Sequence, residues 1–329
     1  MVWKVRDRGL DAIRAAKLVK PSAIPSLEAY SAEARVLSQL EHANIIRVFS
    51  TDVGPKTGDT PDVGKYVIVM EYMDGGSLDD ALRKETFIPL RDAVRHLSAG
   101  CFAATFAHAK GYIHRDIKPA NMLVSGQQTK LSDFGLCAPN VSGGASPAGT
   151  LFYAAPEVVD GGSATFLSDV YSLGVTLYEL INGRSFVDWA GDEPDLKEAV
   201  IRGRFPDRND FQPFVPDRLR KLTRKAMNVE PSKRFASAQD LRHALEAVPV
   251  LCAWTLQEVG DEERWTGVGS GGVFEVVARR KQRDFELRRS KSLPGSMRKV
   301  NADCGTFSTY ADLREHQRYV MSRITEKGK

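Results

Sequence analysis

The chain has 329 residues, of which 42% are hydrophobic and 27% are charged, a composition typical of a globular protein. Its formal net charge is only +4, and its 4 cysteines form no CxxC pair. This cysteine usage argues against a zinc site or a disulfide framework and favours a reducing, cytoplasmic compartment. No apolar run approaches the roughly 18 residues that cross a bilayer, and the N-terminus is unlike a signal peptide, so we expect no membrane partner.

Charge is unevenly distributed along the chain. Residues 1–250 contain 31 basic and 31 acidic residues, whereas residues 251–329 contain 15 basic and 11 acidic residues. The excess lies in two basic clusters, Arg279–Arg283 and Arg288–Lys291. This shift in composition predicts a domain boundary near residue 250. We therefore expect a large domain over residues 1–248 and a smaller extension over residues 249–329.

The large domain begins with β-rich sequence and continues with helical sequence. Hydrophobic periodicity and turn signals predict the following elements: strands at 2–7, 12–20, 44–50 and 66–72 around a helix at 26–40, then helices at 77–83 and 89–111, short strands at 121–124 and 129–132, and an apolar helix at 168–181. Glu33 lies on the inner face of the helix at 26–40, and a carboxylate in that position needs a partner.

One polar loop, at residues 114–121, contains the groups that phosphoryl transfer requires. Asp116 can accept a hydroxyl proton, and Lys118 can neutralise charge on the transferred phosphate. Asn121 and, after a short hairpin, Asp133 can hold magnesium between the phosphates of a nucleotide. A single Asp-rich loop is ordinarily a solvated turn, but these four groups in this order and spacing favour a catalytic site.

The residues HRDIKPAN at 114–121, followed by Asp133-Phe134-Gly135, resemble the eukaryotic-type (Hanks-type) protein kinase family. The resemblance covers about residues 2–248 and implies an α+β, bilobal fold with a small β-rich lobe and a larger helical lobe. The remaining 80 or so residues match no family known to us, and we expect a small α/β extension of two or three strands and a closing helix at 308–324.

The resemblance also implies a site for ATP and Mg²⁺. Asp116 and Lys118 are then the catalytic residues, and Asn121 and Asp133 the metal ligands. The implied nucleotide contacts are the strand lysine and its helix partner, the backbone of the hinge between the lobes, and the residues above and below adenine: Lys17, Glu33, Glu71, Met73, Val2, Ala15 and Leu123.

The segment that follows Asp133 resembles the activation segment of a serine/threonine-specific protein kinase. Its GTxxYxAPE pattern at 149–157 contains Thr150, which in the family hydrogen-bonds the catalytic aspartate. Lys118 agrees with this class. The resemblance thus implies ATP-dependent phosphorylation of serine and threonine in protein substrates. Ser142 and Ser146, in a Gly/Ser-rich stretch, are the expected sites of self-modification, and a nucleic-acid partner is not expected.

Other positions of the pattern imply structural contacts. Asp169, inside the apolar helix at 168–181, is expected to cap backbone amides. Arg234 is expected to be the buried partner of Glu157.

The sequence departs from the family at its start, where Val2 stands just after the expected position of the glycine-rich loop over the phosphates. We therefore expect the small lobe to be truncated at its first strand. A pseudokinase or scaffold with impaired ATP binding is one alternative, and a small-molecule phosphotransferase is another. Gly267–Gly272 also spells GxGxxG, which predicts either a hairpin turn in the extension or a loop that folds back over the nucleotide.

Overall fold

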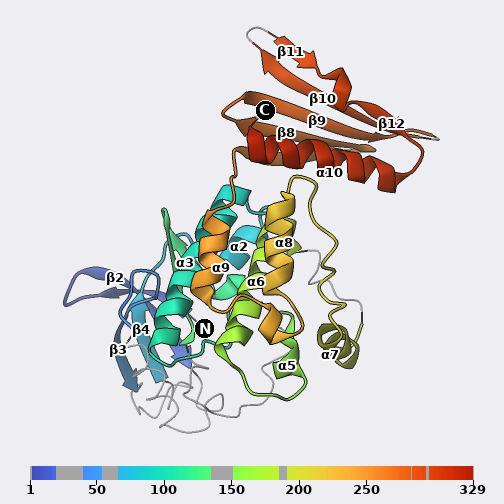
Figure 1. The fold of residues 1–329 in the computed structure, drawn as a ribbon. Coiled ribbons are helices and arrows are strands. Elements are labelled where there is room, and N and C mark those ends of the chain that lie inside the picture. Colours follow the sequence, from blue (N-terminus) through green and yellow to red (C-terminus); the bar gives the residue numbers. More distant parts are fainter. Residues whose placement is uncertain are drawn as a thin grey trace.

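The computed structural model describes residues 2–19, 40–53, 66–134, 151–184, 191–282, 284–293 and 296–328 (Figure 1). Glu33 and the predicted helix around it lie outside these residues. So do Thr150, Ser142 and Ser146 in the predicted activation segment. In the described part of the chain, no helix combines the length and the apolar character needed to cross a membrane.

The small lobe is a four-stranded antiparallel sheet in the order β1-β2-β4-β3. Its strands are β1 (Val2–Asp7), β2 (Ala12–Val19), β3 (Val48–Val53) and β4 (Tyr66–Glu71). Ala15 and Lys17 alternate along β2 and therefore point to one face of the sheet. Ala15 packs in a small cluster with Ile46, Met70 and Met73, so this face of the sheet borders apolar side chains.

The predicted strand at 44–50 is placed too early in the sequence. Residues 44–47 are not in the sheet: the backbone N–H of Ile46 donates to Leu131 of the helical lobe at 2.9 Å, and Ile45 forms an isolated bridge with Leu131. Strand β3 begins only at Val48. Both isoleucines are buried, because they connect the two lobes. An apolar run predicts burial but does not distinguish such a connection from a strand.

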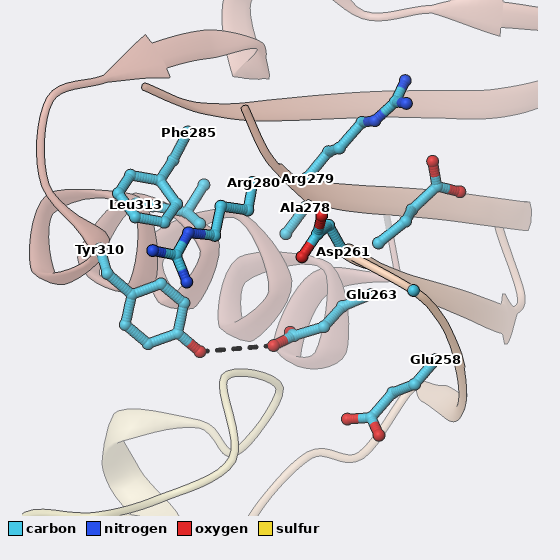
Figure 2. Close-up of a pocket in the computed structure, with 11 residues that line it drawn as sticks. Glu258, Asp261, Glu263, Ala278, Arg279, Arg280, Phe285, Tyr310 and Leu313 are labelled. Atoms are coloured by element: carbon cyan, nitrogen blue, oxygen red, sulfur yellow. Dashed lines mark hydrogen bonds between the residues drawn. The ribbon is translucent and has the colours of Figure 1, made fainter. Parts of the chain in front are cut away.

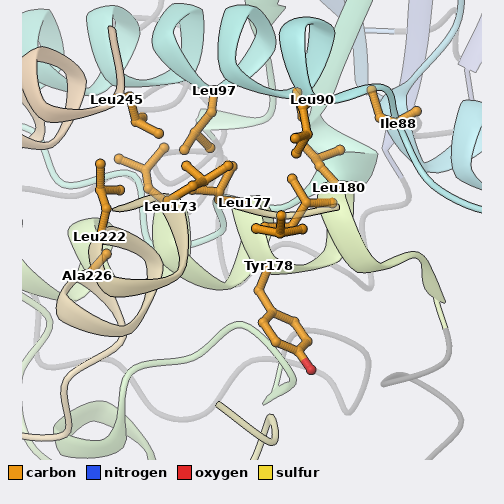
Figure 3. Packing of buried hydrophobic residues seen from close by; sticks show 14 of the residues in the cluster. Ile88, Leu90, Leu97, Leu173, Leu177, Tyr178, Leu180, Leu222, Ala226 and Leu245 are labelled. Atoms are coloured by element: carbon orange, nitrogen blue, oxygen red, sulfur yellow. The ribbon is translucent and has the colours of Figure 1, made fainter. Parts of the chain in front are cut away.

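The large lobe is helical and surrounds one apolar core. Its helices are α2 (Leu78–Leu82), α3 (Leu90–Ala109), α5 (Pro156–Val159), α6 (Phe166–Asn182), α7 (Glu193–Ile201), α8 (Asp217–Ala226) and α9 (Ala238–Glu246). Helix α6 lies in the centre, where Leu173 and Leu177 pack against Leu97 of α3 and Leu222 of α8 (Figure 3). The predicted helices at 77–83, 89–111 and 168–181 are confirmed to within two residues.

A short hairpin on this lobe faces the small lobe. It pairs β5 (Met122–Ser125) with β6 (Gln128–Leu131), as predicted, and follows the 3₁₀ turn Pro119–Asn121 directly. This connection places the catalytic loop on one side of the hairpin and Asp133 on the other. The hairpin therefore brings the two acidic positions of the sequence pattern to the same end of the lobe.

The C-terminal extension is a larger sheet than we predicted. Instead of two or three strands it has six: β7 (Cys252–Val259), β8 (Glu262–Gly269), β9 (Gly272–Arg280), β10 (Phe285–Leu293), β11 (Ser296–Lys299) and β12 (Gly305–Phe307). Strands β7 to β11 form an antiparallel meander, and β12 pairs with β10. Helix α10 (Tyr310–Lys327) covers one face of the sheet (Figure 1).

This extension packs on the helical lobe at the end away from the small lobe (Figure 1). Trp265 of β8 is 1% exposed, and its ring lies 5.9 Å from the ring of Phe87 and 5.4 Å from that of Phe214. Phe87 and Phe214 belong to the core of the helical lobe. The sheet and the lobe thus share one continuous hydrophobic core.

The GxGxxG sequence of the extension is the turn between β8 and β9, where Gly269 pairs with Gly272. A Cβ atom on Gly267 would lie 2.7 Å from the Cys252 sulfur and 2.8 Å from the Trp254 ring, so this glycine is needed for packing inside the sheet. The alternative in which the loop folds over the nucleotide is wrong, because the whole sheet lies at the far end of the helical lobe (Figure 1).

Candidate active site

The loop that contains Asp116 is held from below by the buried carboxylate of Asp169. Its Oδ2 accepts from the backbone N–H of His114 at 2.8 Å, and its Oδ1 accepts from the N–H of Arg115 at 2.9 Å. Burial alone would raise the pKa of Asp169, but its hydrogen bond and charge interaction with His108 hold that pKa below the usual value. The predicted capping role of Asp169 is confirmed, whereas sequence analysis missed His108.

Hydrogen bonds also determine the tautomer of His114. Its Nδ1 accepts from the backbone N–H of Asp116 at 3.2 Å, so its Nε2 must carry the proton that bonds the Ser132 carbonyl at 3.0 Å. Burial lowers the pKa of His114, which favours this neutral form. The ring meets Phe134 edge-on, with centroids 4.5 Å apart. One imidazole therefore connects the catalytic loop to the segment that contains Asp133.

The Asp116 carboxylate is held by two neighbours from its own loop. Its Oδ1 accepts from Lys118 Nζ at 2.8 Å, and its Oδ2 accepts from Asn121 Nδ2 at 2.8 Å. Asn121 Nδ2 also donates to the Asp116 carbonyl at 2.8 Å. Because its amide nitrogen is used in this way, Asn121 keeps its Oδ1 available as a ligand for a cation. Arg115, immediately before Asp116, has φ of 68°, a strained conformation that the bonds to Asp169 stabilise.

Lys17 and Asp133 meet across the gap between the two lobes. Lys17 Nζ of β2 forms an ion pair with Asp133 Oδ1, and both side chains remain partly exposed. Asp133 has φ of 65°, which directs its carboxylate towards the small lobe while the adjacent Phe134 is fully buried. A cation and a carboxylate thus face each other at the mouth of the cleft.

A cavity of about 310 Å³ lies between the lobes next to this ion pair. All the predicted nucleotide-contact residues that the structure describes line it, together with both predicted metal ligands: Val2, Ala15, Lys17, Glu71, Met73, Leu123, Asn121 and Asp133. Asp116 and Lys118 are absent from its lining and lie beyond its polar end, since Asn121 belongs to the cavity and bonds Asp116. The cavity is therefore apolar at one end and charged at the other.

The apolar end is bounded by the segment that connects the lobes. The carboxylate of Glu71 is already engaged in a hydrogen bond, which it accepts from Lys130 Nζ at 2.8 Å. Gly75 donates its N–H to the Val124 carbonyl at 2.9 Å, and a Cβ atom on Gly75 would lie 2.7 Å from that oxygen. This close approach requires glycine and fixes the connection against β5. Glu71 and Met73, which line the cavity, thus belong to a segment that is held against β5.

Below the cleft, the structure reveals a second polar contact that sequence analysis missed. Tyr153 of the APE segment donates to Glu179 Oε2 at 2.6 Å, and Glu179 is fully buried in α6. Burial raises the pKa of Glu179 to about 7. The argument used for Asp169, a carboxylate in an apolar helix, applies equally to Glu179 and could have identified it.

The predicted pair of Glu157 and Arg234 is confirmed. The guanidinium binds both carboxylate oxygens, at 2.7 and 2.6 Å, and also donates to the Leu167 carbonyl at 2.8 Å. Arg234 is 3% exposed. This pair fixes the start of α5 on the helical lobe and takes no part in the cleft.

A second hollow, of about 610 Å³, lies on the C-terminal sheet where the β7–β8 and β9–β10 turns meet the first turn of α10 (Figure 2). Aromatic and acidic side chains line it together with Arg279 and Arg280, and Tyr310 donates to Glu263 at 3.3 Å. The residues that line this hollow include no lysine. The cleft between the lobes, with Lys17 and Asp133 at its mouth, is therefore the site with the groups for phosphoryl transfer.

The arrangement can be tested for its fit to a metal ion. In the described ranges, no three histidine, cysteine, aspartate or glutamate side chains gather as a metal cluster. Asp133 and Asn121 line the same cavity and instead offer carboxylate and amide oxygens, which suits a Mg²⁺ ion whose coordination is completed by phosphate oxygens and water. The donor set therefore fits a nucleotide-bound magnesium ion rather than a metal held by the protein alone.

The fold and the site together define the class of this chain. The family model for the protein kinase domain matches residues 1–245, and the chain belongs to that family. Strand β7 begins after the matched region, at Cys252.

The chain is similar to several bacterial proteins. A probable serine/threonine-protein kinase of Clostridium perfringens is 31% identical over 285 residues, which is 82% of this chain and 39% of the relative. Serine/threonine-protein kinase PknJ of Mycobacterium tuberculosis is 35% identical over 229 residues, 65% of this chain and 37% of the relative. PrkC of Bacillus subtilis is 30% identical over 215 residues, 64% of this chain and 32% of the relative. The chain thus spans less than two-fifths of these relatives.

Proposed function

We propose that this chain transfers the γ-phosphoryl group of ATP to serine and threonine hydroxyls of proteins, with Mg²⁺. The observation that carries the proposal is the position of the Asp116 carboxylate. Lys118 and Asn121 hold it, each at 2.8 Å, beyond the charged end of the cavity that Lys17 and Asp133 share. Membership of the protein kinase family supports the assignment.

Each residue then has a distinct task. Asp116 orients the substrate hydroxyl and accepts its proton, while Lys118 stabilises charge on the transferred phosphoryl group. Lys17 binds the α- and β-phosphates. Asn121 and Asp133 hold Mg²⁺, which when bound neutralises charge on the phosphates. The predicted pairing of Lys17 with Glu33 lies outside the described residues and stays a prediction.

The apolar end of the cavity suits adenine. Ala15 of β2 and Leu123 of β5 come from opposite lobes and belong to the same packed cluster, so they would contact the two faces of a planar base. The backbone of Glu71 and Met73 would hydrogen-bond its edge, and Val2 also lines the cavity. Among the described residues nothing favours the pseudokinase alternative, because Lys17, Asn121 and Asp133 all line one cavity.

Replacing the proposed base tests the activity. Asp116→Asn keeps the size of the side chain but has one acceptor oxygen in place of two, and it cannot take the substrate proton. Labelling of a generic protein acceptor by radioactive ATP should therefore fall by about 10²–10⁴-fold. Asp160→Asn, at an exposed carboxylate after α5, is the matched control and should keep its rate. Equal labelling by the wild type and Asp116→Asn would refute the role of Asp116.

The metal assignment needs a separate measurement. Asp133→Ala should weaken magnesium-dependent ATP binding more than adenosine binding, because the carboxylate acts through the ion and the phosphates. Calorimetry with both ligands, with and without magnesium, distinguishes the two effects. An equal loss for ATP and adenosine would show that Asp133 acts only on the fold.

Self-modification forms the last part of the proposal. Ser142 and Ser146 lie in the Gly/Ser-rich sequence between Asp133 and the APE segment, and they are the hydroxyls we expect the chain to phosphorylate in itself. Peptide mapping after incubation with ATP tests this. Phosphate found only outside residues 136–150 would contradict it.

A further inference from the structure

The hairpin β10–β11 lies at the far edge of the C-terminal sheet (Figure 1). Its side chains contribute to a cluster of cations. Lys291 of β10 lies directly opposite Arg298 of β11, and Lys291 and Arg289 are two residues apart on β10. Directly opposed residues in an antiparallel pair, and residues two apart in a strand, point to the same face. All three side chains therefore lie on the face that α10 covers, since Lys291 is opposite the buried Phe274 of β9.

Contacts connect these cations into one group with Arg323 of α10. Lys291 Nζ and the Arg289 guanidinium lie 5.4 and 5.7 Å from the Phe274 ring. Arg289 forms an ion pair with Asp303, and Arg323 donates to both oxygens of Asp303, at 2.6 and 2.7 Å. We call Arg289, Lys291, Arg298 and Arg323 the cationic cluster.

The cluster lacks enough negative charge of its own. Asp303 is the one acidic side chain of the described residues that forms an ion pair with any member, and it is 3% exposed. Lys291 and Arg298 have no ion pair with a described acidic residue, although like charges directly opposite each other destabilise a sheet. Arg289 Nε is buried without a hydrogen-bond acceptor in the described part of the chain. The structure therefore leaves cations and a donor unsatisfied at one place.

The opposite face of the same sheet differs. There Arg264 pairs with Glu262 and Glu275, and Arg288 pairs with Glu286. Three glutamates thus offset most of the basic charge on this face, although Arg279 has no ion pair among the described residues. The excess of positive charge on the α10 side is local, and it is not a general property of a basic extension.

We propose that the cationic cluster is a docking site for a phosphorylated serine or threonine of a polypeptide. A phosphate monoester has about −1.5 to −2 charges and three acceptor oxygens, and clustered arginines are the side chains that match it. Exposed Tyr319, whose ring lies 5.2 Å from the Arg323 guanidinium, offers a contact surface for the adjoining peptide. This site would bind a product of the proposed kinase reaction, but the binding itself does not depend on catalysis.

The size of the cluster favours a single phosphorylated residue over a nucleic acid. A duplex has one charge per about 1.7 Å, and proteins that bind it strongly contact about 6–10 phosphates. Here four cations share one carboxylate. On the opposite face of the sheet, Arg264 and Arg288 are already ion-paired with glutamates. The cluster therefore matches one phosphate with its peptide and not an extended phosphate backbone.

The test is a binding measurement on the full chain without ATP, by fluorescence anisotropy at physiological ionic strength. The probe is a labelled degenerate nonapeptide pool with a central phosphoserine, and the reference is the same pool with serine. We expect about tenfold tighter binding of the phosphorylated pool, since a charge-assisted pair gives about 1.4 kcal/mol or more. Equal binding of both pools would overturn the proposal.

Variants locate the site. Lys291→Gln with Arg298→Gln should reduce phosphopeptide binding about tenfold, to the level of the serine pool. Arg279→Gln, an exposed arginine on the opposite face with no ion pair among the described residues, is the matched control and should change it less than about twofold. If the control loses as much as the double variant, the effect is net charge and the proposal fails.

Two further arms complete the design. Lys291→Arg keeps the charge and should keep the affinity, which distinguishes a lost contact from a disturbed hairpin. A single-stranded oligonucleotide with the net charge of the phosphopeptide should bind more weakly. Stronger binding of the oligonucleotide would make the surface a nucleic-acid site and overturn the assignment. Because no ATP is present, neither result bears on the kinase activity.

Discussion

The catalytic loop and the C-terminal sheet are both held by residues distant in the sequence, but by different forces. Asp169 holds the loop through two backbone N–H groups and His108, at 2.8 to 2.9 Å. Trp265 holds the sheet through ring contacts with Phe87 and Phe214, whose centroids lie 5.4 to 5.9 Å away. The first contact is polar and directional, whereas the second is apolar and broad.

The difference corresponds to what each region must do. A hydrogen bond to an ionised acceptor fixes individual atoms, and the loop needs Asp116 and Asn121 at defined positions. Burial of aromatic surface depends little on angle and fixes whole elements against one another. We expect polar substitutions to damage the site selectively and apolar ones to detach the sheet.

Removing the loop's anchor should have the largest effect. Asp169→Ala leaves two backbone donors and His108 without their buried acceptor, so the free energy of unfolding should fall by about 3–5 kcal/mol. Activity per folded molecule should fall as well, because Arg115 at φ of 68° loses its support. Urea unfolding and ATP labelling measure the two effects. A loss of stability with undiminished activity would show that the loop does not need this anchor.

Trp265→Ala should come next. Deleting a fully buried tryptophan costs about 3–5 kcal/mol, with the loss concentrated in the C-terminal sheet. Trp3→Ala, at a tryptophan of β1 that is 53% exposed, is the matched control and should change stability by less than about 0.5 kcal/mol. Hydrogen exchange should show faster opening of β7–β10 while β5 and β6 stay protected. Equal loosening of both regions would contradict the separation of roles.

These two anchors also show what the sequence could predict. Asp169 was identifiable because a carboxylate in an apolar helix must have a partner. The loop at 114–121 was identifiable because phosphoryl transfer requires particular side chains there. The capping role of Asp169 and the Glu157–Arg234 pair were both predicted. His108 was missed, because its contact with Asp169 depends on how α3 and α6 pack.

Other failures have a similar cause. Trp265 reads as an ordinary residue of an alternating strand, and nothing local indicates that it reaches Phe87, 178 positions earlier in the numbering. The number of strands in the extension was underestimated: the long strands β7 to β10 already exceed the predicted two or three, and the short strands β11 and β12, with 4 and 3 residues, have no clear period. Contacts between distant elements are determined by packing, which periodicity does not encode.

The pH dependence of stability sharpens the comparison within the polar region. Burial raises the pKa of Glu179 to about 7, above its unfolded value near 4.5. The folded state therefore holds a proton that the unfolded state releases between these values, and the free energy of unfolding falls as pH rises through this window. Glu179→Gln keeps the acceptor for Tyr153 and removes the titration. It should be more stable than the wild type at pH 8, by about 1–3 kcal/mol, and about equal at pH 4.5.

Unfolding measured from pH 4.5 to 8 tests this expectation. Glu198→Gln on α7, an exposed glutamate, is the control and should show no such difference. If the advantage of Glu179→Gln were the same at every pH, the buried carboxyl would not be the group that titrates.

The smallest effects should come from two equivalent helix caps, one in each region. Ser237 accepts from the Asp240 N–H at 3.0 Å at the start of α9, and Thr309 accepts from the Asp312 N–H at 3.2 Å at the start of α10. Ser237→Ala and Thr309→Ala should each cost about 1 kcal/mol. Because Trp265 joins the sheet and the lobe in one core, both variants should lower the same thermal transition. If Thr309→Ala instead splits off an earlier transition, seen by tryptophan fluorescence before circular dichroism, the apolar contact would couple the two regions less tightly than the shared core implies.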